Sequence, residues 1–147
     1  SEEISWVDGG MIPFVGEQLM LRVQPSLVAT AAQREDEVLS LFVANNDAAQ
    51  IEQAVLQWYR QRAENLFAER VAYYAPLLNV APTAIKLSRA KTLWGSCTTR
   101  GVVRLNERLI RLPLHLIDYV VVHELAHLRE MNHSEQFWTI VQSACPD

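Results

Sequence analysis

The chain has 147 residues, of which 50% are hydrophobic and 20% are charged, so it is long enough for one globular domain over 1–147 with its own core. No apolar run reaches about 18 residues and no secretory leader is recognisable, so neither a membrane protein nor a secreted one is expected. Two cysteines, Cys97 and Cys145, are too few for a disulfide framework, which favours the reducing cytoplasm.

The net charge of −4 hides an uneven distribution of charge along the chain. Between residues 86 and 111, Glu107 stands among seven basic residues, Lys86, Arg89, Lys91, Arg100, Arg104, Arg108 and Arg111. Such a stretch could attract an anionic substrate or a nucleic acid. It could equally be the positively charged edge of a sheet, because natural sheets use such charges to avoid pairing with other chains.

Residues 1–45 are predicted to be rich in β-structure. Short apolar runs at 12–14 and 18–23, separated by Gly16-Glu17, indicate a β-hairpin. The apolar run at 38–43 indicates a further strand before the chain enters its second part, residues 46–147.

A long helix and two strands are predicted next. Asp47 is a suitable N-cap for the helix, and Pro76 is expected to end it at about residue 75. Strands are predicted at 83–90 and 101–106. Two glycines are expected to bracket a turn or bulge between these strands, Gly95 and Gly101.

The next predicted helix starts with Pro113 in its first turn, is apolar nearly all round, and carries the motif His123-Glu124-Leu125-Ala126-His127. Residues four apart lie on one face of a helix, so His123 and His127 can bind the same metal ion. Glu124 lies beside them, where it can accept a proton from a water. His133 suits a third ligand after a turn, and Ser134 is expected to cap a final helix. Three ligands and an open position are typical of catalytic zinc sites.

Other residues near the motif leave alternatives open. Glu130 could replace His133 as the third ligand, and Asp118 could orient a ligand histidine. Tyr119, one turn before His123, could donate to a developing oxyanion or simply be packed. Cys97 is expected to be a small buried residue.

The densest set of motifs is Trp94-Gly95-Ser96-Cys97-Thr98, Leu105-Asn106, the segment 117–128, Asn132-His133-Ser134 and Phe137-Trp138. On this set the chain resembles the YgjP-like metallopeptidase-domain family, which is related to the SprT-type proteases. The resemblance implies metal ligands at His123, His127 and His133, a catalytic Glu124, and a cleft wall shaped by Trp94, Ser96 and Thr98. It also implies an α+β, zincin-like fold, in which a long helix backs a small mixed sheet and a central helix binds the metal. The N-terminal hairpin region is additional.

The metzincins share this ligand spacing but have glycine where this chain has Glu130. The turn before His133 must therefore be made differently. Asn132, which tolerates the left-handed conformation, is the predicted hinge.

The leading hypothesis is a zinc-dependent metallopeptidase with one Zn²⁺ per chain and Glu124 as general base. A peptide substrate could pair with an edge strand from 84–90 or 94–106. One alternative is a metal-dependent phosphohydrolase or pyrophosphatase acting on nucleotides, with Lys91 and Arg104 neutralising phosphate charge. Another is a nucleic-acid-associated protease or binding module of SprT type, which the overall acidity disfavours.

Overall fold

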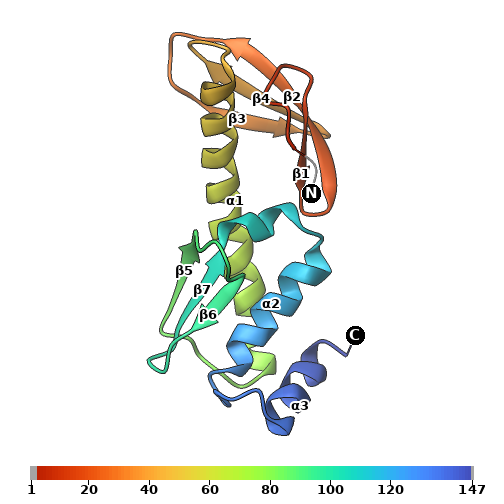
Figure 1. Ribbon diagram of the computed structural model, residues 1–147, viewed down its shortest axis with the longest axis vertical. Coiled ribbons are helices and arrows are strands. Elements are labelled where there is room, and N and C mark those ends of the chain that lie inside the picture. The colour runs from red at the N-terminus through yellow and green to blue at the C-terminus, as the bar shows by residue number, and fades with distance from the viewer. Residues whose placement is uncertain (1–2, 147) are drawn as a thin grey trace. The chain divides into compact units, whose positions relative to one another are not determined.

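Two small mixed β-sheets and three α-helices form a mixed α+β fold in the described part of the chain, residues 3–146 (Figure 1). The structure is a computed structural model. Its contacts divide the chain into two compact units, and the division falls between Gln61 and Arg62, inside the longest helix, α1 (Ala48–Leu77). The α+β class agrees with the prediction. The sequence, however, predicts one mixed sheet with a separate hairpin region, and there are two sheets.

The first unit contains a four-stranded sheet with the order β1-β2-β4-β3. Its strands are β1 (Met11–Phe14), β2 (Glu17–Pro25), β3 (Thr30–Glu35) and β4 (Val38–Val43). The predicted hairpin is β1 and β2, which pair antiparallel around Val15 and Gly16, both at positive φ as a two-residue primed turn requires. Strand β4 was also predicted and lies parallel to β2. Strand β3 was not predicted; it pairs antiparallel with β4 at the edge of the sheet.

The core of the first unit joins alternate residues of this sheet to the first half of α1. Leu39 and Leu41 of β4 are fully buried, as are residues of β1 and β2. Phe14 packs on Trp58 with ring centroids 4.7 Å apart, and the Tyr59 hydroxyl donates to the carbonyl of Pro13. Burial of these aromatic rings, together with the aliphatic side chains of the sheet, stabilises the unit.

Helix α1 begins as predicted and ends slightly later. The Asp47 carboxylate accepts the Gln50 N–H at 2.9 Å, which confirms the N-cap. Pro76 lies inside the last turn of the helix, which ends at Leu77. The predicted end at about residue 75 is therefore two residues too early. The chain leaves the helix at Asn79, whose φ of 56° is left-handed, while the Val80 N–H bonds the Ala75 carbonyl.

The second unit contains a three-stranded sheet with the order β5-β7-β6. Its strands are β5 (Ala84–Ser88), β6 (Gly95–Cys97) and β7 (Val102–Asn106). The central β7 is parallel to β5 and antiparallel to β6, so β6 is an edge strand. Gly95 therefore begins a strand, and the expectation that it flanks a turn is wrong. Gly101, with φ 87°, does lie in the turn between β6 and β7.

Three further helical segments follow: η1 (Glu107–Arg111), a 3-10 helix that was not predicted, α2 (Leu114–Ala126) and α3 (Glu135–Ala144). Pro113 precedes α2 at the N-cap position and is not in its first turn, a small correction to the prediction. Several residues of α2 are fully buried, among them Ile117, Val121 and Leu125. The Ser134 hydroxyl accepts the Phe137 N–H at 3.3 Å, which confirms the predicted cap of α3. Within residues 3–146, no helix is long and apolar enough to span a bilayer.

Candidate metal centre

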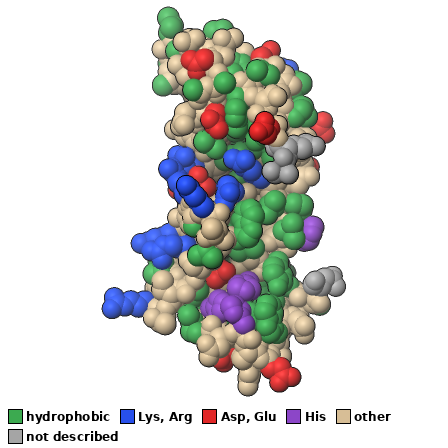
Figure 2. Space-filling view, in the orientation of Figure 1, with side chains coloured by type: hydrophobic (Ala, Val, Ile, Leu, Met, Phe, Trp, Pro, Cys, Tyr) green, Lys and Arg blue, Asp and Glu red, His purple; other side chains and the backbone are tan. Residues whose placement is uncertain are grey.

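Three histidines meet at the C-terminal end of α2. His123 lies in the last turn of the helix, His127 is its C-cap, and His133 comes from the loop before α3. One ring nitrogen from each lies within 4.8 Å of the others, so the three could hold one cation. The His127 side chain is buried, whereas His133 is exposed. Figure 2 shows histidine side chains gathered on one face of the molecule.

Two of the imidazoles have a second ring nitrogen held by an oxygen. His123 Nδ1 lies 3.0 Å from Glu124 Oε2, and His127 Nδ1 lies 3.1 Å from the Glu130 carbonyl oxygen. A carboxylate and a carbonyl only accept hydrogen bonds, so each neutral imidazole carries its proton on Nδ1. The Nε2 lone pairs of both rings are then available to a metal ion, as is usual for ligand histidines with an outer hydrogen bond.

The chain turns after α2 by tightening the helix. The N–H groups of His127, Leu128 and Arg129 bond to the carbonyls three residues earlier. Within residues 3–146, the non-glycine residues with positive φ are Val15, Asp36 and Asn79. The predicted left-handed hinge at Asn132 is therefore wrong, because short-range 3-10 bonds make the turn with ordinary dihedral angles.

Glu124 is buried, with 5% of its surface exposed, and lies against β6. A Cβ placed on Gly95 would lie 2.9 Å from Glu124 Cγ and 3.0 Å from Glu124 Oε2. Glycine at this position therefore leaves the space that the carboxylate occupies. Cys97, two residues further along β6, is only partly buried; burial and, to a smaller extent, the charge of Glu124 raise the pKa of its thiol.

The position of β6 depends on the buried side chain of Asn106. Its Nδ2 donates to the carbonyls of Ala90 and Leu93 at 2.7 and 3.0 Å, and its Oδ1 accepts the Arg108 N–H. These bonds fix the loop that enters β6 at Trp94. Asn106 thus supports the site from below the surface, which its place in the sequence motif did not explain.

Aromatic side chains of α3 pack on the histidines. Phe137 is fully buried and stacks on His127 with centroids 4.4 Å apart. Trp138 stacks on His133 at 5.9 Å and remains 39% exposed, so it offers an apolar surface beside the cluster. From the sequence, Phe137-Trp138 is a shared motif, and these rings have no predicted role beside the histidines. Their position directly after the cap Ser134 was the available signal.

Tyr119 lies beside the cluster as well. It is one turn before His123 on α2, its ring centroid is 6.4 Å from that of His123, and it is 38% exposed. This placement keeps the predicted role open for its hydroxyl, because the ring is neither fully packed nor distant from the histidines.

Asp118 has a different role from the one predicted. Its carboxylate receives two hydrogen bonds from Arg70, at 2.8 and 2.9 Å, and one from the Tyr74 hydroxyl at 3.1 Å. The hydrogen bond to Asp118 is the main cause that raises the pKa of Arg70. Burial and, to a smaller extent, the charge of Asp118 raise the pKa of the Tyr74 hydroxyl. Asp118 therefore fastens α2 to α1, and Glu124 and the Glu130 carbonyl are the oxygens that contact the histidines.

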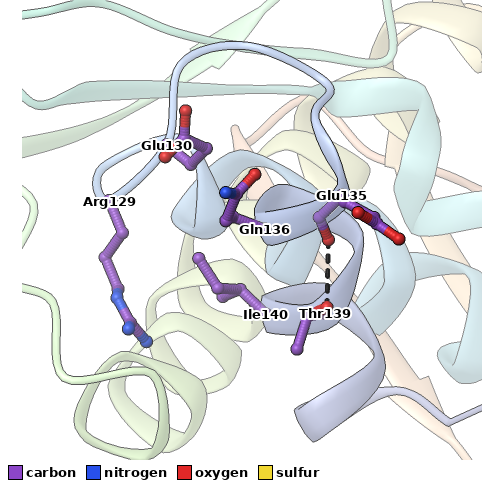
Figure 3. A pocket seen from close by; sticks show the side chains of 6 residues that line it. All are labelled: Arg129, Glu130, Glu135, Gln136, Thr139 and Ile140. Carbon is purple, nitrogen blue, oxygen red and sulfur yellow. Dashed lines mark hydrogen bonds between the residues drawn. The ribbon is translucent and has the colours of Figure 1, made fainter.

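The Glu130 side chain is turned to another surface. With Arg129 and the first turns of α3 it lines an open hollow (Figure 3), whose other residues are Glu135, Gln136, Thr139 and Ile140. Within residues 3–146, the carboxylate of Glu130 is not part of the group of ligand atoms formed by the histidines. The geometry thus favours His133 over Glu130 as the third donor.

The basic stretch is partly used within the fold. Arg89 pairs with Glu107 at 3.4 Å, and Arg108 donates to the carbonyls of Ala90 and Lys91. The Arg108 guanidinium also lies 5.4 Å from the centre of the Trp94 ring. Within residues 3–146, no hydrogen bond, ion pair or ring contact joins the histidines to the remaining predicted substrate-binding residues, namely Trp94, Ser96, Lys91 and Arg104.

Three imidazoles from the end of α2 and the loop that follows it, beside a buried carboxylate, form an arrangement suited to a metallopeptidase domain. The chain belongs to the YgjP-like family: the family model described as YgjP-like, metallopeptidase domain, matches residues 1–147. No curated protein matches the chain.

Among solved structures, the chain is similar to the metallopeptidase zymogen of Pyrococcus abyssi abylysin. The two share 21% sequence identity with a TM-score of 0.51, over 55% of this chain and 81% of that one. At this identity the likeness concerns the fold alone, and it agrees with the α+β architecture described above.

Proposed function

We propose that this chain is a zinc-dependent metallopeptidase in which His123, His127 and His133 hold the metal and Glu124 is the general base. The convergence of three ring nitrogens within 4.8 Å of one another is the observation that carries the proposal. Family membership supports peptidase chemistry at the level of the family. The free thiols of Cys97 and Cys145 agree with the reducing cytoplasm as the proposed compartment.

The donor set fits zinc. Neutral imidazoles suit several transition metals, but hydrolysis calls for a Lewis acid without redox chemistry. When bound, zinc polarises the scissile carbonyl and lowers the pKa of a bound water towards neutrality. His123, His127 and His133 would hold the ion, and three protein donors are the number usual for catalytic rather than structural zinc.

The residues of the chain then handle the proton. Glu124 Oε2 is held by the Nδ1–H of His123, which leaves Oε1 to accept the proton of the attacking water. Glu124 next donates that proton to the leaving amine. Burial of Glu124 excludes bulk water from this carboxylate. We assign Tyr119, whose ring centroid lies 6.4 Å from that of His123, as the hydrogen-bond donor to the developing oxyanion.

The edge strand β6 is the proposed docking site for an extended peptide. It has β7 on one side and, within residues 3–146, no strand on the other. Glu124 contacts β6 at Gly95, so a peptide added to this edge would pass close to the carboxylate.

The test compares Glu124→Gln with Glu130→Gln, a matched change in a carboxylate that lies outside the histidine group. Glu124→Gln should retain zinc. Its rate of peptide hydrolysis should fall by a factor of about 10² to 10⁴, because the change removes proton transfer alone. Glu130→Gln should keep both. Zinc is measured by elemental analysis, and cleavage by mass spectrometry of a mixture of short peptides.

Undiminished hydrolysis in Glu124→Gln would contradict the mechanism. The same preparations are assayed for phosphate or pyrophosphate release from nucleoside triphosphates. Release that depends on Glu124, without any peptide cleavage, would replace the peptidase assignment with the phosphohydrolase that the basic stretch suggests.

A further inference from the structure

A row of two cations and a serine crosses the three-stranded sheet. In the register of the strands, Lys86 of β5 lies opposite Arg104 of β7, and Arg104 lies opposite Ser96 of β6. Directly opposite residues share a face of the sheet, so the three side chains project from the same side. Gly95 faces Glu124 on the other side, and the alternation of a strand places Ser96 away from Glu124.

The two cations of this row have no anionic partner in the described chain. Within residues 3–146, neither Lys86 nor Arg104 takes part in an ion pair or a side-chain hydrogen bond. Arg104 is nevertheless partly buried. Like charges directly opposite each other destabilise a sheet, and partial burial adds to that cost. The cost would be offset by an anion brought to this row by a ligand. Figure 2 shows Lys and Arg side chains on the same face of the molecule as the histidines.

The hydrogen bonds of β6 show which of its groups face outward. The Asn106 N–H bonds the Trp94 carbonyl, and the Thr98 N–H bonds the Val102 carbonyl. Antiparallel pairs bond at every second residue, so Ser96 also directs its backbone groups to β7. Gly95 and Cys97 consequently direct their N–H and C=O groups to the free edge of β6.

A peptide bonded to Gly95 and Cys97 has its side chains placed by this pattern. The peptide residue opposite Gly95 faces the side of Glu124. The peptide residue opposite Ser96 directs its side chain to the face that carries Arg104. The backbone of this peptide residue lies two strand spacings, about 10 Å, from the backbone of Arg104. The small Ser96 side chain between them leaves room for the guanidinium and a carboxylate to meet.

We infer that Arg104, with Lys86 behind it, selects peptide substrates that carry aspartate or glutamate at the position opposite Ser96. This position is the chain neighbour of the residue that faces Glu124. Arginine can bind the carboxylate through two parallel hydrogen bonds, and Lys86 adds positive charge to the same face. The inference rests on the proposed function, since it assigns a substrate preference to the same docking edge.

The first experiment measures kcat/KM for paired peptides that differ by glutamate or glutamine at one position near the cleaved bond. The native chain should cleave the glutamate peptide about tenfold faster or more, as expected for a charge-assisted hydrogen bond. Arg104→Gln should reduce this ratio to about one, and Arg104→Glu should favour lysine there. Arg100→Ala, which removes an exposed cation from the turn of the same sheet, should keep the native ratio.

A second pair of variants leaves Arg104 in place. Ser96→Asp puts a carboxylate directly opposite Arg104, so it should abolish the preference for acidic peptides. Ser96→Asn has the same size without the charge and should keep the preference. If Ser96→Asp and Ser96→Asn behave alike, or if Arg104→Glu leaves the preference unchanged, the inference is overturned.

Binding separates failure of the inference from failure of the proposed function. The labelled glutamate and glutamine peptides are titrated into Glu124→Gln protein and into its Arg104→Gln double variant by fluorescence anisotropy. Tighter binding of the glutamate peptide that depends on Arg104, without hydrolysis by the native chain, supports the inference and rejects the peptidase. Hydrolysis without any acidic preference rejects the inference and keeps the peptidase. Absence of both binding and hydrolysis rejects both.

Discussion

The two ends of helix α2 hold their polar side chains in different ways. Near its start, every oxygen of the Asp118 carboxylate has a partner from α1, in Arg70 or Tyr74. At its end, His123 and His127 each have Nδ1 beside an oxygen, and one ring nitrogen of each lies within 4.8 Å of a ring nitrogen of His133. A fully satisfied buried network fixes structure, whereas converging unmatched lone pairs are suited to a ligand. The start of α2 is therefore suited to holding the helix on α1, and its end is suited to binding a ligand.

This comparison predicts the largest change in activity at the histidine end. His133→Ala should abolish tight zinc binding and reduce peptide hydrolysis about a thousandfold or more, because two donors remain where three converge. His133 is exposed, so the free energy of unfolding of the metal-free chain should change by less than about 0.5 kcal/mol. Zinc titration and urea unfolding check the two parts. A metal-free variant that unfolds much more easily would show that His133 is structural.

The opposite result is expected at the start of α2. Asp118→Ala should lower the free energy of unfolding by about 3 kcal/mol, since it leaves the Arg70 charge without its partner. The value lies at the low end of the usual range because the Arg70 side chain is 24% exposed. The double variant Asp118→Leu with Arg70→Met should recover much of the loss. Urea unfolding measures stability, and zinc affinity per folded chain should stay within about threefold. A larger loss of zinc affinity would contradict this difference between the two ends of α2.

Gly95→Ala tests whether β6 shapes the histidine end. The new Cβ would lie 2.9 Å from Glu124 Cγ and 3.1 Å from the backbone oxygen of Arg104, and the flexible side chain can shift more easily than the strand. Glu124 must shift, so kcat should fall about ten- to a hundredfold while zinc binding is kept. The control is Cys97→Ala, on the same face of the same strand, with kcat within about twofold. Equal kcat for Gly95→Ala and the native chain would remove the positioning role.

The smallest expected effect concerns the two thiols. Burial and the Glu124 charge raise the pKa of Cys97, so Glu124→Gln should lower that pKa and speed alkylation near pH 8 about two- to threefold. Burial and, to a smaller extent, the charge of Asp118 raise the pKa of the Cys145 thiol. The alkylation of Cys145 should therefore not respond to Glu124→Gln. Peptide mapping after timed iodoacetamide treatment measures both in one sample. An equal response of the two thiols would show that Glu124 does not act on Cys97 locally.

The sequence predicted best where one local rule is sufficient. The spacing of His123 and His127 follows from the helix repeat, and the caps Asp47 and Ser134 follow from the side-chain oxygens that helix starts require. It predicted poorly where partners are distant in the chain. The bonds of Asp118 to α1 span 44 to 48 residues, and nothing near Asp118 in the sequence specifies them.

The missed strands have a different physical cause. Strand β6 has three residues, Gly95–Cys97, too few to show an alternating pattern. Strand β3 is an exposed edge with mostly polar residues, so its sequence lacks the apolar alternation of a half-buried strand. The contact of Gly95 with Glu124 was equally hidden, because a glycine in a sequence usually indicates a turn, and a close approach appears only in three dimensions.

Two adjacent residues have different roles: His133 belongs to the group of three histidines, and Ser134 is the N-cap of α3. Ser134 starts α3, and α3 docks through the buried Phe137 and Val141, so the third imidazole moves with a helix that contributes no ligand of its own. The packing of α3 therefore holds His133 in position beside His123 and His127. Loss of the buried side chains of α3 should therefore displace His133 from the other two imidazoles while leaving residues 123–127 intact.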